Sequence, residues 1–169
     1  MDFLDIVHTR RSIRKFTDDP VSSEDVDILL HAAMSSPTAT NSQSWRFVVI
    51  DDKDLSREIP HIHPHAGPAA DAPLAILVCG DVEAGHAPEC WPQDGAAAIQ
   101  TMLLTARSLE LGSVWSAIHP FVDREDAFIK LFGLPGTVRP LGLVILGHPA
   151  QPFNRADRYD AAKVHHNHW

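Results

Sequence analysis

An uninterrupted apolar segment near the middle of the chain most constrains its fold. Residues 74–79 read Leu-Ala-Ile-Leu-Val-Cys, with no charged or amide side chain at any position. A strand with one face in water alternates apolar and polar residues, so a continuous apolar run of this length indicates a strand buried on both faces. The sheet that contains this strand must therefore be flanked by other elements on both sides.

Hydrophobic periodicity predicts the helices that could flank this sheet. Apolar residues at helical spacing predict one helix that begins at a cap on Asp2 and ends near Thr9. They predict a second from Ser22 or Ser23 to about Met34. A third helix, over residues 95–111, is apolar on almost every side, and we expect Gly112 to end it in the left-handed conformation.

Further elements follow from shorter patterns. Residues 45–50, 113–117 and 138–147 have the composition of strands. Asp123 is positioned to cap a helix that ends at Gly133. Residues 60–73 are rich in proline, histidine and alanine, and we expect an irregular connection there.

Composition indicates the class of protein. The 169 residues are 44% hydrophobic and 21% charged, which suits one core and a single domain over residues 1–169. The longest uncharged apolar stretch, residues 95–106, is shorter than the ~20 residues that span a bilayer. The N-terminus lacks the basic region and apolar run of a secretory signal. We therefore expect a cytoplasmic protein in which Cys79 and Cys90 stay reduced.

A basic cluster interrupts a chain that is otherwise acidic. Residues 10–16 read Arg-Arg-Ser-Ile-Arg-Lys-Phe, whereas the whole chain carries a net charge of −8. In an extended segment Arg10, Ser12 and Arg14 would share a face and could converge on one phosphate. A solvated surface, a targeting signal and a nucleic-acid patch are the alternatives. The acidic total and the lack of a second basic stripe disfavour nucleic acid, so a small phosphorylated ligand fits better.

Two other segments carry polar groups suited to a ligand. Residues 37–45 read Pro-Thr-Ala-Thr-Asn-Ser-Gln-Ser-Trp, and their hydroxyls and amides suit sugar or ribityl hydroxyls and heterocycle edges. An ordinary helix-to-strand loop is the alternative. His61, His63 and His65 would share one face if extended and could then contribute to a metal site, but they lack nearby cysteine or acidic ligands. We predict no metal, and expect His63 or His65 to line a pocket or face solvent.

Taken together, these segments resemble the FMN-dependent nitroreductase family. The resemblance rests on residues 10–16 after a short helix and on residues 37–45 before a strand. Similar stretches follow in order at 72–81, 94–115, 133–135, 144–149, 157–160 and 164–169, so nearly the whole chain is covered. The resemblance implies an α+β fold with a central mixed sheet, antiparallel pairs and flanking helices. It also implies an intertwined homodimer, with residues 95–111 in its core and the tail, residues 149–169, on the partner subunit.

The same resemblance implies roles for individual residues. Arg10 and Ser12 would bind the FMN phosphate, and Arg14 would reach the pyrimidine edge of the ring. A cation at that edge favours the anionic reduced flavin and raises its potential. Ser116 and Ala117 match the strand end whose backbone amides approach flavin N5 and O4, although many members have glycine in place of Ala117. The full expected cofactor-binding set is Arg10, Arg11, Ser12, Arg14, Pro37, Thr38, Ala39, Asn41, Ser116, Ala117 and Arg158.

The loop and the tail would act across the subunit boundary. The members of this set in residues 37–41 would contact the flavin bound mainly to the other subunit, with Gln43 supporting their loop. Ser44 replaces the proline that usually precedes the tryptophan. Arg158 is the tail residue expected at the phosphate, with Arg155 as the alternative. We expect the substrate pocket to include Thr40, His63 and His65.

The activity implied is the reduction of nitroaromatics, quinones or similar conjugated acceptors by NAD(P)H through FMN, with ping-pong kinetics. No catalytic side chain is required, because hydride transfer takes place at flavin N5. No Gly-x-Gly-x-x-Gly motif follows a strand, so the nicotinamide would bind only transiently at the flavin. Reductive dehalogenation, flavin degradation and a non-catalytic FMN-binding or redox-sensing role remain alternatives, as does a histidine-rich metal-binding protein.

Overall fold

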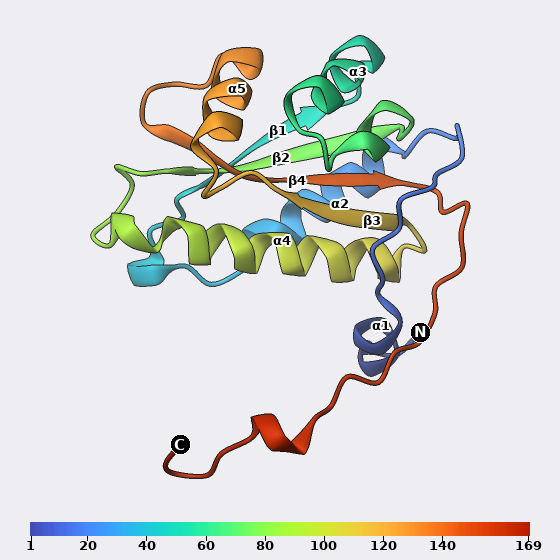
Figure 1. The fold of residues 1–169 in the computed structure, drawn as a ribbon, viewed down its shortest axis with the longest axis vertical. Coiled ribbons are helices and arrows are strands. Elements are labelled where there is room, and N and C mark those ends of the chain that lie inside the picture. Colours follow the sequence, from blue (N-terminus) through green and yellow to red (C-terminus); the bar gives the residue numbers. More distant parts are fainter.

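A four-stranded sheet separates two layers of helices in the computed structural model, which describes residues 1–169 (Figure 1). The strands pair in the order β1-β2-β4-β3, and all three pairings are antiparallel. An isolated parallel bridge joins Ser12 to Ser113. The α+β class with antiparallel pairs is confirmed. The strands are β1 (Trp45–Ile50), β2 (Leu74–Asp81), β3 (Gly112–Ala117) and β4 (Val138–Gly147).

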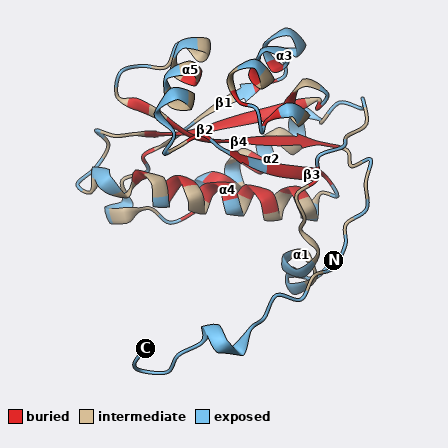
Figure 2. Ribbon diagram, viewed as in Figure 1, coloured by how far each residue is buried: buried red, intermediate tan, exposed pale blue.

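The two central strands are buried on both faces, as the apolar run at 74–79 predicted. Alternate side chains enter different cores: Ile76 packs in one cluster and Leu77 in the other. Helices α2 (Ser23–Met34) and α4 (Trp91–Ser108) cover the first face. Helices α3 (Lys53–Ile62) and α5 (Val122–Phe132) cover the second, and Figure 2 shows the buried residues concentrated in the sheet and along the inner side of α4.

Helix α1 (Phe3–Thr9) and the C-terminal tail lie to one side of these layers (Figure 1). Asp2 caps α1 by accepting a hydrogen bond from the Asp5 amide, as predicted, yet no residue of this helix is buried. Arg107 of α4 attaches both segments, because its Nε donates to Thr9 Oγ1 at 3.0 Å and its guanidinium covers the Phe153 ring. The tail beyond residue 156 is exposed throughout.

The ends of two predicted helices differ from the structure. Helix α4 begins at Trp91 and ends at Ser108, instead of spanning 95–111. Its left-handed residue is Glu110, with φ of 61°, and not Gly112. Gly112 instead starts β3, where an added Cβ would lie 2.6 Å from Ile13 Cγ2, so its role is to allow close packing. Asp123 lies inside α5, whose N-cap position is Phe121, although Gly133 does end that helix with φ of 60°.

Helix α3 was not anticipated from the sequence. Asp52 caps it by accepting hydrogen bonds from the amides of Asp54 and Leu55, and Pro60 lies within its last turn. Only residues after Ile62 form the irregular connection expected over 60–73. Short 3₁₀ turns occur at Ala39–Asn41, Gly67–Ala70, Pro88–Cys90 and Ala161–Lys163. None of the helices combines the length and the apolar character that a membrane span requires.

Candidate functional site

The basic cluster runs along the free edge of the sheet. Ile13 donates its amide hydrogen to the Ser113 carbonyl at 2.9 Å, and its side chain is fully buried. This anchor leaves the neighbouring Ser12 only partly buried and Arg14 exposed. Gln151 fixes the next turn of chain by accepting hydrogen bonds from the amides of Arg14 and Lys15. The cluster is therefore held in place by the sheet and by the start of the tail.

A polar hollow of about 370 Å³ opens beside this cluster. Its lining includes Ser12 and the side chains of Arg11, Arg14 and Arg158, with no hydrophobic residue. Burial lowers the pKa of Arg10, and repulsion from Arg11 and Arg158 lowers it further. The ion pairs of the structure involve other residues, so no carboxylate balances these four cations. An uncompensated group of cations with a hydroxyl fits a phosphate monoester.

The tail arginines occupy different places. Arg158 lines the polar hollow, whereas Arg155 pairs with Asp5 of α1 at 3.4 Å. Arg11 turns partly back toward its own helix, since its guanidinium donates to the carbonyl oxygens of His8 at 2.7 Å and Ala156 at 3.5 Å. Arg11 therefore also joins α1 to the tail, and Arg158 is the tail residue positioned for a phosphate.

A second hollow of about 370 Å³ continues from the cluster along β3. Arg10 and Ser12 lie at one end, Gln100 and Leu103 of α4 form a wall, and β3 supplies Trp115 and Ala117. Since the two hollows meet at Ser12, a ligand with its phosphate there could extend its other end toward Ala117.

The pairing of β3 decides which of its amides face this hollow. Backbone groups of an edge strand point alternately toward its neighbour and away from it. Ser113 points away from β4, because its carbonyl accepts from Ile13, so Trp115 and Ala117 point away as well. The amide of Ser116 faces β4, while that of Ala117 lies on the open edge. Ala117 also has no positive φ, so the alanine causes no backbone strain there.

The carbonyl of Ala117 accepts two hydrogen bonds. His63 Nε2 lies 2.9 Å from it and Arg124 Nη1 lies 3.1 Å from it. His63 Nδ1 faces the His65 amide at 3.3 Å, so Nδ1 accepts and Nε2 carries the proton. Burial lowers the pKa of His63, against the opposing effect of its hydrogen bond to Ala117, and the imidazole is therefore neutral at pH 7.

The three histidines at 61–65 do not converge. His63 is 1% exposed and lies behind the end of β3, His65 is exposed beside it, and His61 faces Glu58 on the outer side of α3 at 3.6 Å. No group of three or more histidine, cysteine or acidic side chains is arranged to hold a metal ion.

The polar loop at 37–44 is organised by one buried carboxylate. Asp94 of α4, only 4% exposed, accepts hydrogen bonds from the Ala39 amide at 2.8 Å, Ser42 Oγ at 3.0 Å and Ser44 Oγ at 3.1 Å. Ser44, which replaces the proline that usually precedes the tryptophan, thus supplies one of these donors. Gln43 braces the loop, because its amide donates to Thr38 Oγ1 and its side chain donates to Asn41 Oδ1.

This anchoring holds an unusual backbone. Thr40, Asn41 and Gln43 have φ values of 53°, 55° and 48°, in the left-handed region that side chains rarely adopt. Pro37, Thr38, Ala39, Thr40 and Asn41 are all at least partly accessible, so the loop presents its polar groups outward.

The loop and helix α1, which leads into the basic cluster, contact opposite ends of α4. Asp94 holds the loop near the first turn, and Arg107 holds α1 at the last turn. Twelve residues of helix lie between Asp94 and Arg107, and the thirteen steps from one to the other correspond to about 20 Å at ~1.5 Å per residue. Within one chain the expected cofactor-binding residues therefore form two separate groups.

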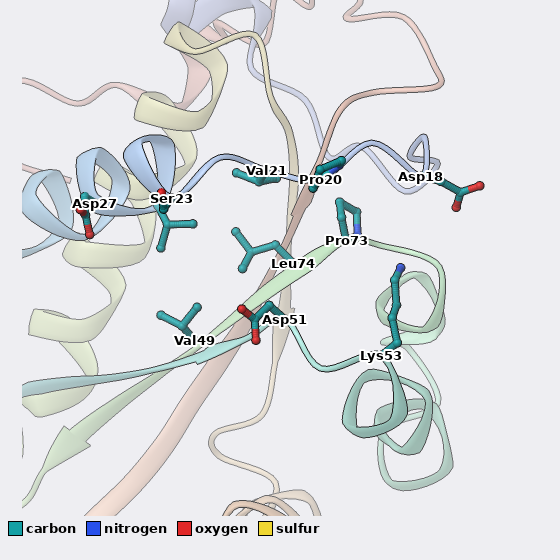
Figure 3. Close-up of a pocket in the computed structure, with 11 residues that line it drawn as sticks. Asp18, Pro20, Val21, Ser23, Asp27, Val49, Asp51, Lys53, Pro73 and Leu74 are labelled. Carbon is teal, nitrogen blue, oxygen red and sulfur yellow. The ribbon is translucent and has the colours of Figure 1, made fainter.

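A further hollow of about 420 Å³ lies away from both groups, between the start of α2 and the adjoining ends of β1 and β2 (Figure 3). Val49 and Leu74 contribute apolar surface, while Asp18, Asp27 and Asp51 outnumber the single cation Lys53. This charge balance disfavours a phosphate, and none of the predicted site residues lies there.

Two residues of the site were missed by reasoning from the sequence. A single acidic residue in the apolar stretch that forms α4 was a usable signal for Asp94, since a buried carboxylate needs several donors. Arg124 gave no signal, because its contact with Ala117 depends on how residues 118–121 turn at the end of β3.

Comparisons with known proteins find similar sequences and similar folds. The family model described as the nitroreductase family matches residues 7–69 and 61–148. A candidate NADH dehydrogenase/NAD(P)H nitroreductase of Methanothermobacter thermautotrophicus is 39% identical over all of this chain and 88% of that protein. The crystal structure of a candidate NADH oxidase of Clostridium acetobutylicum has a TM-score of 0.95 and 34% identity, covering 98% of this chain and 100% of that one.

A third relative carries the cofactor in its crystal structure. A candidate nitroreductase of Desulfovibrio desulfuricans, in complex with FMN, has a TM-score of 0.88 and 30% identity, covering 100% of this chain and 98% of that one. Sequence and fold therefore agree along nearly the whole length, and the chain belongs to the nitroreductase family.

Proposed function

We propose that this protein is an FMN-dependent oxidoreductase that uses NAD(P)H to reduce nitroaromatics, quinones or similar conjugated acceptors. The observation that carries the proposal is the uncompensated cationic hollow that continues along β3 to the open amide of Ala117. A phosphate at one end and a heterocycle at the other is the layout of FMN. Family membership and the FMN-bound relative support the same cofactor.

The residues present fit FMN in chemical type. Ser12, which the two hollows share, would hold the phosphate together with Arg10 from one hollow and Arg158 from the other. Arg14 lines the same hollow as Arg158, and its exposed side chain would have to extend from there to place its charge at the pyrimidine edge of the ring. Ala117 would donate its amide hydrogen to the N5 and O4 edge, with Ser116 paired to β4 behind it. When bound, FMN supplies the hydride acceptor for NAD(P)H and the donor for the second substrate, in a ping-pong sequence. Thr40 and His65 are proposed for the substrate pocket together with His63, whose burial limits it to an indirect role.

The separation of the two groups of site residues favours a homodimer that shares each flavin. Residues 37–41 of one subunit would complete the site whose phosphate is bound by the other. Helix α1 leaves Phe3, Leu4 and Val7 exposed, and the tail leaves Tyr159 and Trp169 exposed, so both offer apolar surface for a second copy. The tail, residues 149–169, would pack on that partner.

An absorption spectrum of the purified protein tests the proposal first. We expect a yellow protein with about one FMN per chain, bleached by NADH or NADPH without oxygen and recoloured by a quinone or nitroaromatic. A colourless protein that takes up no added FMN would remove the proposed cofactor. A flavin that stays coloured with both nicotinamides would leave the protein as a flavin-binding sensor and contradict the enzymatic function.

A further inference from the structure

At the end of β3, the carbonyl and the amide of Ala117 differ in their hydrogen bonding. Its carbonyl oxygen receives hydrogen bonds from His63 and Arg124, while its amide on the same open edge is left available. The residues of an edge strand that point away from its neighbour usually leave both groups to solvent. Because two side chains from different segments donate to this one carbonyl oxygen, the arrangement indicates a specific role for the two contacts.

Arg124 is held in place by more than this one contact. Its guanidinium lies 4.1 Å from the centre of the Phe121 ring, and its amide donates to the Phe121 carbonyl at 3.0 Å. A guanidinium fixed on both sides keeps its positive charge beside Ala117, where a mobile side chain would spread that charge into solvent. Glu125, the next residue, pairs with His119 at 2.9 Å and not with Arg124.

His63 is fixed from the opposite side. It follows α3, its amide donates to the Ile59 carbonyl at 2.9 Å, and its ring lies edge-on to Phe128 of α5. The His65 amide occupies Nδ1, which leaves Nε2 as the donor to Ala117. Ser116 Oγ adds a contact to the His65 carbonyl at 3.4 Å, so residues 63–65 are joined to the last two residues of β3.

We propose that His63 and Arg124 are positioning residues that cap the Ala117 carbonyl, so that the bound flavin meets the Ala117 amide and the Arg124 charge. The inference rests on the proposed function, in which this amide lies at the N5 and O4 edge. An uncapped carbonyl oxygen there carries partial negative charge and would repel the negative charge that a flavin gains on reduction. The cap removes this repulsion and adds a cation at the ring edge opposite the one assigned to Arg14.

Charge at Arg124 should therefore raise the potential of the bound flavin. Arg124→Gln is expected to weaken binding of reduced FMN about tenfold relative to oxidised FMN, which lowers the two-electron potential by about 30 mV. Arg124→Lys should recover part of this loss, because it keeps the charge without the planar fork. Lys130→Gln is the matched control, since it removes a charge from the exposed side of the same helix.

His63→Gln supplies an independent variant with a donor but without the ring. The flavin potential of His63→Gln should stay closer to that of wild type than the potential of His63→Leu does, because His63→Leu leaves the Ala117 carbonyl with one donor. If His63→Leu does not fold, the Arg124 variants still test the inference, because Arg124 is only half-buried and its substitution should leave the fold intact. Potentials are measured by anaerobic dye equilibration, and dissociation constants of both FMN redox states by fluorescence, so neither readout is turnover.

The outcomes separate the inference from the function on which it rests. A wild-type protein that binds no FMN overturns the proposed function and the inference with it. If wild type binds FMN and is reduced by NAD(P)H, a lowered potential in Arg124→Gln with an unchanged Lys130→Gln supports the inference. Equal potentials in wild type and Arg124→Gln, or an equal fall in Arg124→Gln and Lys130→Gln, overturn it while the function stands.

Discussion

Near the two ends of helix α4, two halves of the proposed site are held in opposite ways. At the clamp end, which comprises residues 10–14 and Arg158, four cations lack any carboxylate partner. At the loop end, which comprises residues 37–44, the buried Asp94 has three donors. The clamp end is incomplete without an anion, whereas the loop end is complete within the chain. The clamp end is thus suited to bind an anion, and the loop end is suited to keep a fixed shape.

The largest effect should come from Asp94→Asn at the loop end. An amide cannot accept from all three donors, and hydrogen bonds to charged groups contribute about 1.5–3 kcal/mol each. We expect a loss of about 2–4 kcal/mol in the free energy of unfolding, together with reduced FMN content. Denaturant unfolding and the flavin-to-protein absorbance ratio measure both. A variant with unchanged stability would show that the loop does not depend on this carboxylate.

Changes at the clamp end should affect the ligand and leave the fold intact. Arg10→Gln should weaken FMN binding by roughly tenfold to a hundredfold, because it removes a charge-assisted contact to the phosphate. Its unfolding midpoint without FMN should match or exceed that of wild type, since repulsion from Arg11 and Arg158 is relieved. Arg14→Gln should also lower the flavin potential. Equal potentials in Arg14→Gln and wild type would contradict the division of roles.

A smaller, pH-dependent effect is expected from His63, near the end of β3. Burial lowers the pKa of His63 in the folded state, so the unfolded chain binds its proton more readily. The contribution of His63 is complete above the ordinary imidazole pKa and decreases as the pH falls through it. Between pH 7.5 and 5.5 the wild-type melting temperature should fall more than that of His63→Gln. Parallel curves for the two proteins would contradict this.

The smallest effect concerns the thiols. Burial raises the pKa of Cys79 to about 12, whereas Cys90 is partly exposed just before α4. A thiol reagent should modify one cysteine per chain in the native protein, and both after unfolding. Rapid modification of both thiols in the native protein would mean that β2 is not in the buried centre of the sheet.

Local signals in the sequence were enough for elements that depend on local chemistry. The cap at Asp2 was predicted, as were a cap at Ser22 or Ser23, the buried strand at 74–79 and the end of a helix at Gly133. Helix α3 was missed because Pro60 and the adjacent histidines masked its capping residue, Asp52, and the regular spacing of Leu55, Ile59 and Ile62.

Features that depend on distant contacts could not be obtained in this way. Gly112 reads as a helix terminator, and only the approach of Ile13 reveals its packing role. For the candidate site, the family motif pointed to the clamp end and the loop, and their role in binding a cofactor stays a prediction. The contact of His63 with Ala117 joins segments 54 residues apart in the sequence, and that of Arg124 depends on the turn that follows β3, so no local pattern encodes either contact.

A mixed dimer tests the central claim most directly, namely that each FMN site combines the clamp end of one chain with the loop end of another. Arg10→Gln and Asp94→Asn chains, each with a different tag, are co-expressed and the mixed species is isolated. One site would then carry both substitutions and the other neither. We predict about half the wild-type FMN content in the mixed dimer, well above either variant alone. An FMN content no higher than that of the two variants alone would contradict the shared site.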